Sequence, residues 1–203
     1  MNLPLTVDSY AKGLRWEDYL SRMTSNQDLA RNLYGEARLT PEDRTDLEQA
    51  ILRHGGRIYL SAMTEPWCGD SAANLPMIAR LASELSGVEL RIFVRHEHPD
   101  LQAAYEADGI DRIPTVSVFD ASFHELGRWV ERPKAANARI EAWKTGYPEL
   151  EALGKSPNPE DKKRRRAIYD GLLDEMVVWY RGGMWNETVR ELKEILLPVD
   201  VHA

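Results

Sequence analysis

The stretch Trp67-Cys68-Gly69-Asp70-Ser71 decides the fold, because it joins a β-type run to a helical pattern. The run Arg57–Met63 before it is short and rich in strand-forming residues, and Leu75–Leu85 after it carries apolar side chains at helical spacing. Cys68 therefore opens a helix. The first turn of a helix has unpaired backbone N–H groups and a partial positive charge, which stabilise a thiolate. The position predicts a lowered pKa for Cys68 and a nucleophilic sulfur.

The residues that follow Cys68 also affect the expected pKa and exposure of its sulfur. Gly69 lets the chain turn and is expected to leave the sulfur open, and the Ser71 hydroxyl lies one helical turn on, where it can donate to the sulfur. The Asp70 carboxylate acts in the opposite sense, because it disfavours a second negative charge. Cys68 is the one cysteine of the chain, so it is either a packed small hydrophobe or a functional thiol. Its place at a helix start favours the functional thiol.

The order of the elements around this stretch predicts an α/β fold. Val88–Val94 is a second strand, and with Arg57–Met63 and the intervening helix it makes a βαβ unit with parallel strands and a right-handed crossover. Four further elements are expected: a helix over Pro99–Ala107, a strand over Ile113–Phe119, its hairpin partner Leu126–Val130, and a helix over Ala135–Lys144. This order predicts a four-stranded mixed sheet with helices on both faces.

The remaining residues are expected to be helical extensions of one central core. We expect a single domain over residues 1–203, with the core at about 56–146 and helical extensions at 1–55 and 147–203. Thr40-Pro41-Glu42-Asp43 has the residues of a helix start, and Gly55-Gly56 those of a helix end. The break at Gly154–Pro159 is followed by two helical patterns.

Composition excludes several classes of function. The chain has 203 residues, of which 43% are hydrophobic and 29% charged, and its net charge of −7 disfavours binding to nucleic acid or to an anionic membrane. No apolar run approaches the roughly 20 residues of a membrane span, and the N-terminus resembles no secretion signal, so we expect a cytosolic protein. The basic run Lys162–Arg166 is interpreted as a solvated helix surface, and His96-Glu97-His98 as a solvated loop without a metal.

The sequence resembles the thioredoxin superfamily in two of the segments described above. Trp67–Ser71 after a strand is similar to the redox motif of that superfamily, and Ile113-Pro114-Thr115 is similar to its cis-proline loop. The runs Leu90–Phe93, His98–Leu101 and Glu125–Pro133 look like a bacterial branch with a Trp-Cys-Gly-Asp-Cys-type motif and helical extensions. The resemblance covers roughly the central half of the chain.

The resemblance implies a three-layer thioredoxin-like fold and a cis Ile113–Pro114 peptide bond beside Cys68. The implied catalytic residues are Cys68 and Ser71, and the implied substrate-binding residues are Trp67, Gly69, Asp70, Ile113, Pro114 and Thr115. An extended substrate would pair with the proline loop as an added strand. Without the resemblance, Pro114 could simply open an edge strand.

Two positions depart from the family pattern. Ser71 stands where the family usually has a second cysteine, and Ala62 stands where many members have a buried acid. Because Ser71 cannot resolve a mixed disulfide, the remaining chemistry uses one thiol. The Cys68 thiolate would attack a protein or small-molecule disulfide, and an external thiol such as glutathione or another low-molecular-weight thiol would release the product. No tightly bound cofactor is expected.

Two other functions are compatible with these departures. A redox-inactive binding module would keep the groove beside Pro114 for protein recognition and would have lost the redox cycle. A structural protein would use its added helices as an oligomer interface. The sequence leaves the oligomeric state open, and it also leaves open whether the terminal helices cover Cys68.

Overall fold

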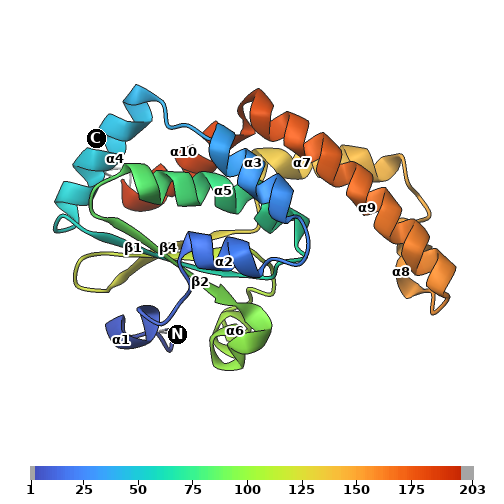
Figure 1. Cartoon of the computed structure of the whole chain (residues 1–203), viewed down its shortest axis with the longest axis horizontal. Coiled ribbons are helices and arrows are strands. Elements are labelled where there is room, and N and C mark those ends of the chain that lie inside the picture. Colours follow the sequence, from blue (N-terminus) through green and yellow to red (C-terminus); the bar gives the residue numbers. More distant parts are fainter. Residues whose placement is uncertain (1–2, 198–203) are drawn as a thin grey trace.

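The computed structural model describes residues 3–197 and has an α/β architecture with helices on both faces of one sheet (Figure 1). The helices before the sheet are α1 (Val7–Tyr10), α2 (Trp16–Arg22), α3 (Gln27–Glu36) and α4 (Pro41–Arg53). The core elements are β1 (Ile58–Thr64), α5 (Gly69–Glu84), β2 (Val88–Val94), η1 (Arg95–Glu97), α6 (Pro99–Ala107), β3 (Thr115–Phe119), β4 (Glu125–Val130) and α7 (Lys134–Thr145). The last elements are α8 (Leu150–Lys155), α9 (Pro159–Trp179), η2 (Tyr180–Met184) and α10 (Trp185–Leu196).

The sheet has the predicted mixed topology, with strand order β2-β1-β3-β4. β1 pairs with β2 in parallel and with β3 antiparallel, and β3 pairs with β4 antiparallel. β3 begins at Thr115, two residues later than predicted from the sequence. The Ile113–Pro114 peptide bond is cis, and proline has no N–H to donate to the sheet, so the ladder starts after it.

The strands β1, β2 and β3 divide their side chains between two apolar clusters. In β1, Leu60 and Ala62 lie in the larger cluster, which α5 also joins, whereas Met63 lies in the smaller cluster. This division follows from the alternation of side chains along a strand. Figure 1 shows α3, α4, α5 and α10 above the sheet and α1 and α6 below it. Cys68 lies in the smaller cluster, together with Tyr10 of α1 and Tyr105 of α6.

The N- and C-terminal helices pack on the same core. α4 starts as predicted, with the Thr40 side chain accepting a hydrogen bond from the Asp43 N–H, and residues with positive φ at Gly55 and Gly56 follow its end. α10 packs against α4, α5 and β4. Its Trp185 side chain donates to the Ala73 carbonyl at 3.1 Å, which fixes the helix beside α5.

The helices α8 and α9 form an arm that extends away from the sheet (Figure 1). The arm ends at η2, where Gly183 has a φ of 113°, and this left-handed residue redirects the chain into α10. The base of α9 lies against the start of α5: a Cβ at Gly69 would be 3.5 Å from the Leu173 Cδ1 atom. The C-terminal extension therefore does reach the Cys68 turn. Within residues 3–197, no helix combines the length and the apolarity that crossing a membrane requires.

Candidate functional site

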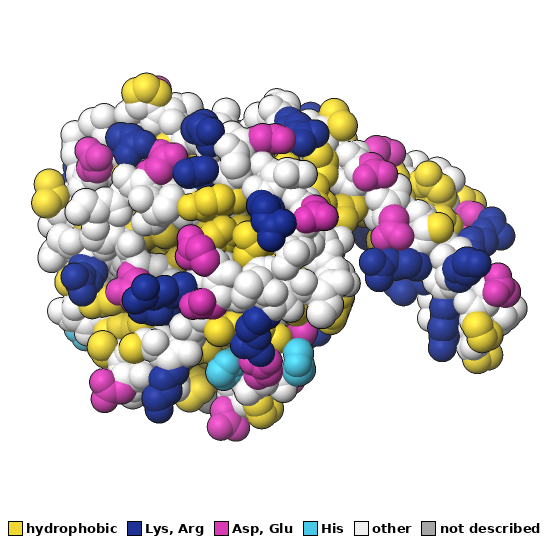
Figure 2. Space-filling model, viewed as in Figure 1, with side chains coloured by type: hydrophobic (Ala, Val, Ile, Leu, Met, Phe, Trp, Pro, Cys, Tyr) yellow, Lys and Arg dark blue, Asp and Glu magenta, His cyan; other side chains and the backbone are white. Residues whose placement is uncertain are grey.

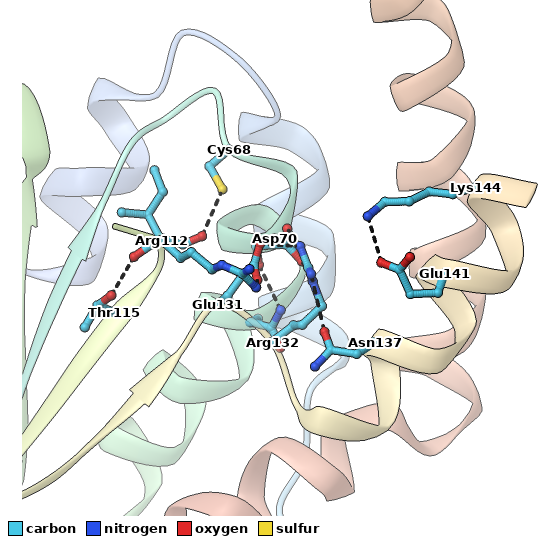
Figure 3. A network of polar contacts seen from close by, with 11 residues as sticks. Cys68, Asp70, Arg112, Thr115, Glu131, Arg132, Asn137, Glu141 and Lys144 are labelled. Atoms are coloured by element: carbon cyan, nitrogen blue, oxygen red, sulfur yellow. Dashed lines mark hydrogen bonds and ion pairs between the residues drawn. The ribbon is translucent and has the colours of Figure 1, made fainter. Parts of the chain in front are cut away.

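Cys68 is the residue that precedes α5, and its backbone fits the predicted strand-to-helix turn. The Cys68 N–H donates to the Glu65 carbonyl at 3.1 Å, and the Cys68 carbonyl accepts from the Ala72 N–H as the first bond of the helix. The sulfur lies 3.4 Å from the Ile113 carbonyl, to which the thiol donates (Figure 3). The fold thus brings Cys68 and the cis-proline loop together although 45 residues separate them.

The environment of the thiol differs from the one predicted from the sequence. Cys68 is only 8% exposed, so Gly69 does not leave the sulfur open. Burial raises the pKa of the Cys68 thiol above its usual value, whereas hydrogen bonds from Ser71 and nearby backbone groups lower it and the Asp70 charge raises it. The predicted lowering of this pKa is therefore wrong. The helix start does favour the thiolate, but removal of the sulfur from water has the larger effect.

A chain of buried hydroxyls lies behind Cys68. Ser71 is 2% exposed, and its oxygen accepts a hydrogen bond from the Thr64 hydroxyl at 2.6 Å. Ser71 can therefore direct its own proton at the sulfur, as the sequence suggested. Burial raises the pKa of Tyr19 to about 12, and the nearby Thr64 hydroxyl opposes the rise. The sequence did not identify Tyr19, because nothing local marks a residue of α2 as a neighbour of Thr64.

A buried acid lies near Cys68, but not at the position expected from the family. Ala62, which stands at the expected position, is fully buried, and its methyl group cannot act as an acid. Glu65, which is 4% exposed, instead accepts from the His96 backbone N–H at 2.9 Å and lies 3.0 Å from the His96 ring nitrogen Nδ1. His96 thus serves as a partner of Glu65. Among the described residues, no cluster of His, Cys, Asp and Glu is suited to hold a metal ion.

Asp70 is held by Arg132 in a bidentate ion pair. The Arg132 Nε and Nη2 atoms donate to the two Asp70 carboxylate oxygens at 2.7 and 2.6 Å (Figure 3). Burial raises the pKa of Asp70, and Arg132 opposes that rise. Arg132 also binds Glu131, which in turn binds Arg112. The pair reduces the effect of the Asp70 charge on the thiol, which the sequence alone could not show.

A cavity of about 660 Å³ lies between the Cys68 turn, α7 and α9. Four of the predicted site residues line it: Trp67, Cys68, Gly69 and Asp70. The other four do not. Ser71 is buried beneath it, the Thr115 hydroxyl donates to the Arg112 carbonyl at 2.6 Å, and Ile113 and Pro114 form the adjoining loop.

The cavity also contains charged residues that sequence reasoning did not assign to the site. They come from the proline loop, the segment after β4, α7 and α9: Arg112, Glu131, Arg132, Glu141, Lys144, Arg165, Arg166 and Asp170. Arg165 and Arg166 belong to the basic run that the sequence indicated as a solvated helix surface. No local signal could have placed this run beside Cys68, because its position depends on how the arm packs.

A mixed four-stranded sheet between helices, with a cysteine at a helix start beside a cis-proline loop, defines the thioredoxin-like class of proteins. Comparison with known families agrees. A family model described as thioredoxin matches residues 13–144, and the chain belongs to the thioredoxin superfamily.

Two solved structures share the fold. An HIV epitope-scaffold protein has 19% sequence identity and a TM-score of 0.58, with 92% of this chain and 94% of that chain covered. A protein of unknown function from Pseudomonas aeruginosa has 23% identity and a TM-score of 0.55, with 83% of this chain and 99% of that chain covered. At these identities the likeness concerns the fold alone. No curated protein matches the sequence.

Proposed function

We propose that the protein is a thiol–disulfide oxidoreductase that uses Cys68 alone as its nucleophile and an external thiol for release. The observation that carries the proposal is the position of the Cys68 sulfur, 3.4 Å from the Ile113 carbonyl of the cis-proline loop, in a chain of the thioredoxin superfamily. A reducing compartment such as the cytosol would supply the external thiol.

The proposed reaction has two exchange steps that conserve electrons. In the first, the Cys68 thiolate attacks one sulfur of a disulfide, the new S–S bond to Cys68 forms, the old S–S bond breaks, and the other half leaves as a thiolate. In the second, the thiolate of a low-molecular-weight thiol such as glutathione attacks the substrate sulfur of the mixed disulfide. Cys68 then leaves as a thiolate, and the substrate departs as a disulfide with the external thiol.

Ser71 has a positioning role in this proposal. Its hydroxyl is buried, accepts from Thr64, and forms a hydrogen bond that lowers the pKa of Cys68. A hydroxyl that donates to a sulfur stabilises the thiolate both before attack and when Cys68 is the leaving group. Ser71 cannot form a disulfide, so it takes no part in resolution.

Burial of the thiol favours a second candidate, a redox-inactive binding module of thioredoxin fold. Cys68 is 8% exposed, and burial raises its pKa, so only a minor fraction is thiolate at neutral pH. A module of this kind would retain the cavity for recognition and would not need the thiol to react.

The two candidates differ in the fate of Cys68 when a disulfide is added. The protein would be mixed with 2-hydroxyethyl disulfide between pH 6 and 10 and followed by intact mass, and glutathione would then be added. The oxidoreductase predicts one adduct, on Cys68, which glutathione removes, and no adduct in Cys68→Ser. A thiol that stays unmodified across this pH range in the folded protein would rule out the oxidoreductase and leave the binding module.

A further inference from the structure

The cavity beside Cys68 has a size and a charge that indicate what it binds. We propose that it is the site of a small disulfide that carries carboxylate groups, and that Arg165 of the arm is the charged residue that recognises a carboxylate. This inference rests on the proposed function for its chemistry, since it names the substrate class of the same thiol. Figure 2 shows Lys and Arg side chains gathered on the arm where it stands out from the body.

The cavity has the size of a small-molecule site. The volume of about 660 Å³ lies within the range of roughly 300–1,000 Å³ that small-molecule sites occupy. The base of α9 faces the start of α5, with Leu173 3.5 Å from the place a Cβ would take at Gly69. The Ile113 carbonyl, to which an added strand would bind, already accepts from Cys68. A small disulfide therefore fits this site better than an extended segment of a folded protein does.

The charged side chains of the cavity do not balance. The cavity is lined by five cationic side chains and four carboxylates, which leaves one positive charge in excess. Four of the cations have carboxylate partners: Arg112 with Glu131, Arg132 with Asp70, Lys144 with Glu141, and Arg166 with Asp170. Within residues 3–197, no carboxylate pairs with Arg165, whose guanidinium lies over the Tyr169 ring at 5.0 Å from its centroid. Stacking on Tyr169 holds the planar group in place and leaves its donors for a ligand.

The cavity also has an apolar part. Besides the charged groups, its walls include Trp67, Ile140, Leu172, Leu173 and Met176. A disulfide with short methylene arms and terminal carboxylates would place its arms on these side chains and a carboxylate at Arg165. The Cys68 thiolate would then attack the nearer sulfur, forming the Cys68 mixed disulfide and releasing one carboxylate-bearing thiolate.

Three disulfides of nearly the same shape test the charge preference. Intact mass would give the rate of Cys68 adduct formation with 3,3'-dithiodipropionate (anionic), 2-hydroxyethyl disulfide (neutral) and cystamine (cationic). We expect the anionic compound to react fastest after correction for the intrinsic reactivity of each disulfide with a small thiol. Arg165→Ala should lower the anionic rate about two- to fivefold, in the range of a partly exposed ion pair, and leave the neutral rate unchanged.

The matched control is Lys163→Ala, which removes one positive charge from the same helix but from a residue that does not line the cavity. It should leave all three rates unchanged. The preference of the unaltered protein should also shrink at 1 M salt, where charges are screened within about 3 Å. Equal corrected rates for the three disulfides, or equal losses in the two variants, would overturn the inference.

A binding measurement separates this inference from the proposed function. Calorimetric titration of Cys68→Ser with 3,3'-dithiodipropionate needs no reactive thiol. If Arg165→Ala weakens this binding and Lys163→Ala does not, the cavity selects anions. That result would uphold the inference even if Cys68 proved unreactive. Absence of binding, or equal binding of cystamine, would overturn the inference even if Cys68 reacted with the neutral disulfide.

Discussion

At the scale of single residues, the Asp70–Arg132 pair shows how the site tolerates a carboxylate beside a thiol. The side chains are 17% and 13% exposed, and Arg132 lies in the segment after β4. Burial without a partner would make an Asp70 charge very unfavourable, so the two oxygens each receive a guanidinium donor. The charge of each side chain is therefore stabilised by its partner more than by solvent.

Removal of both partners should cost less stability than the two single removals added together. Arg132→Met leaves the buried Asp70 carboxylate uncompensated, and we expect it to lower the free energy of unfolding by about 3 kcal/mol. The double variant Asp70→Leu, Arg132→Met should lose less than the sum of the single losses, as measured by urea unfolding. Lys155→Met, which breaks the exposed Lys155–Glu151 pair of α8, should change stability little. Additive losses at Asp70 and Arg132 would contradict the coupling.

The pH dependence of Cys68 is also a property of single residues. Because burial raises its pKa in the folded state, the alkylation rate should still be rising above about pH 8.5, the usual midpoint of a free cysteine. Folding favours the protonated thiol, so this contribution to stability is full below the unfolded-state pKa and decreases as the pH rises through the folded-state pKa. Ser71→Ala removes a hydrogen bond that lowers the pKa, so its alkylation midpoint should be higher still. A midpoint below that of the unaltered protein would exclude a hydrogen bond from Ser71 to the thiolate.

At the scale of elements, the connection from α5 to β2 depends on a glycine at a close approach. Gly87 has a φ of +90°, and a Cβ there would lie 2.5 Å from the Gly56 carbonyl oxygen. The Gly87 carbonyl accepts from the Ile58 N–H at 2.8 Å, at the point where the parallel pairing of β1 and β2 begins. The βαβ unit that carries Cys68 is therefore closed by a position that only glycine fits.

Gly87→Ala should lower the free energy of unfolding by about 1–3 kcal/mol, because it combines a left-handed φ with a backbone clash. Gly171→Ala is the matched control, since this glycine lies within α9 and no atom lies within 4 Å of its Cβ position. The control should be neutral or more stable by up to about 1 kcal/mol, from helix propensity. Denaturant unfolding would measure the change in the free energy of unfolding for each variant. Equal changes would show that Gly87 is not required at this position.

At the scale of the whole molecule, the C-terminal helices do more than pack on the sheet. α10 packs beside α5, while α9 lies against the Cys68 turn and extends outward with α8. The base of the arm is anchored by buried apolar residues such as Met176, which is 3% exposed, and its far end is largely solvated. Access to Cys68 should therefore depend on how firmly this base is packed.

Met176→Ala should loosen the arm and speed the alkylation of Cys68. A buried methionine changed to alanine typically lowers stability by 2–5 kcal/mol, and here the loss falls on α9 first. Hydrogen exchange should quicken in α8 and α9 while β1 and β3 stay protected. The control is Met77→Ala in α5, where Met77 is 1% exposed and does not line the cavity. Equal acceleration of alkylation in both variants would show that the arm does not limit access.

The local properties of this chain were predictable from its sequence, whereas the non-local ones were not. The strand, turn and helix around Cys68, the βαβ unit and the hairpin of β3 and β4 were all predictable, because hydrophobic spacing and turn residues are local signals. The helix start at Thr40 was visible for the same reason. The division into a core and two helical extensions remains a prediction.

The sequence by itself determined the fold and the place of Cys68 at the start of a helix, and its resemblance to a known family implied the proline loop beside that cysteine. Only the tertiary structure decided the burial and raised pKa of the thiol, the Asp70–Arg132 pair between residues 62 apart, and the cavity under the arm. The physical reason is that a pKa, an ion pair and a cavity depend on desolvation and on which distant side chains meet. Desolvation and the contacts between distant side chains are set by tertiary packing, which no local pattern in the chain encodes.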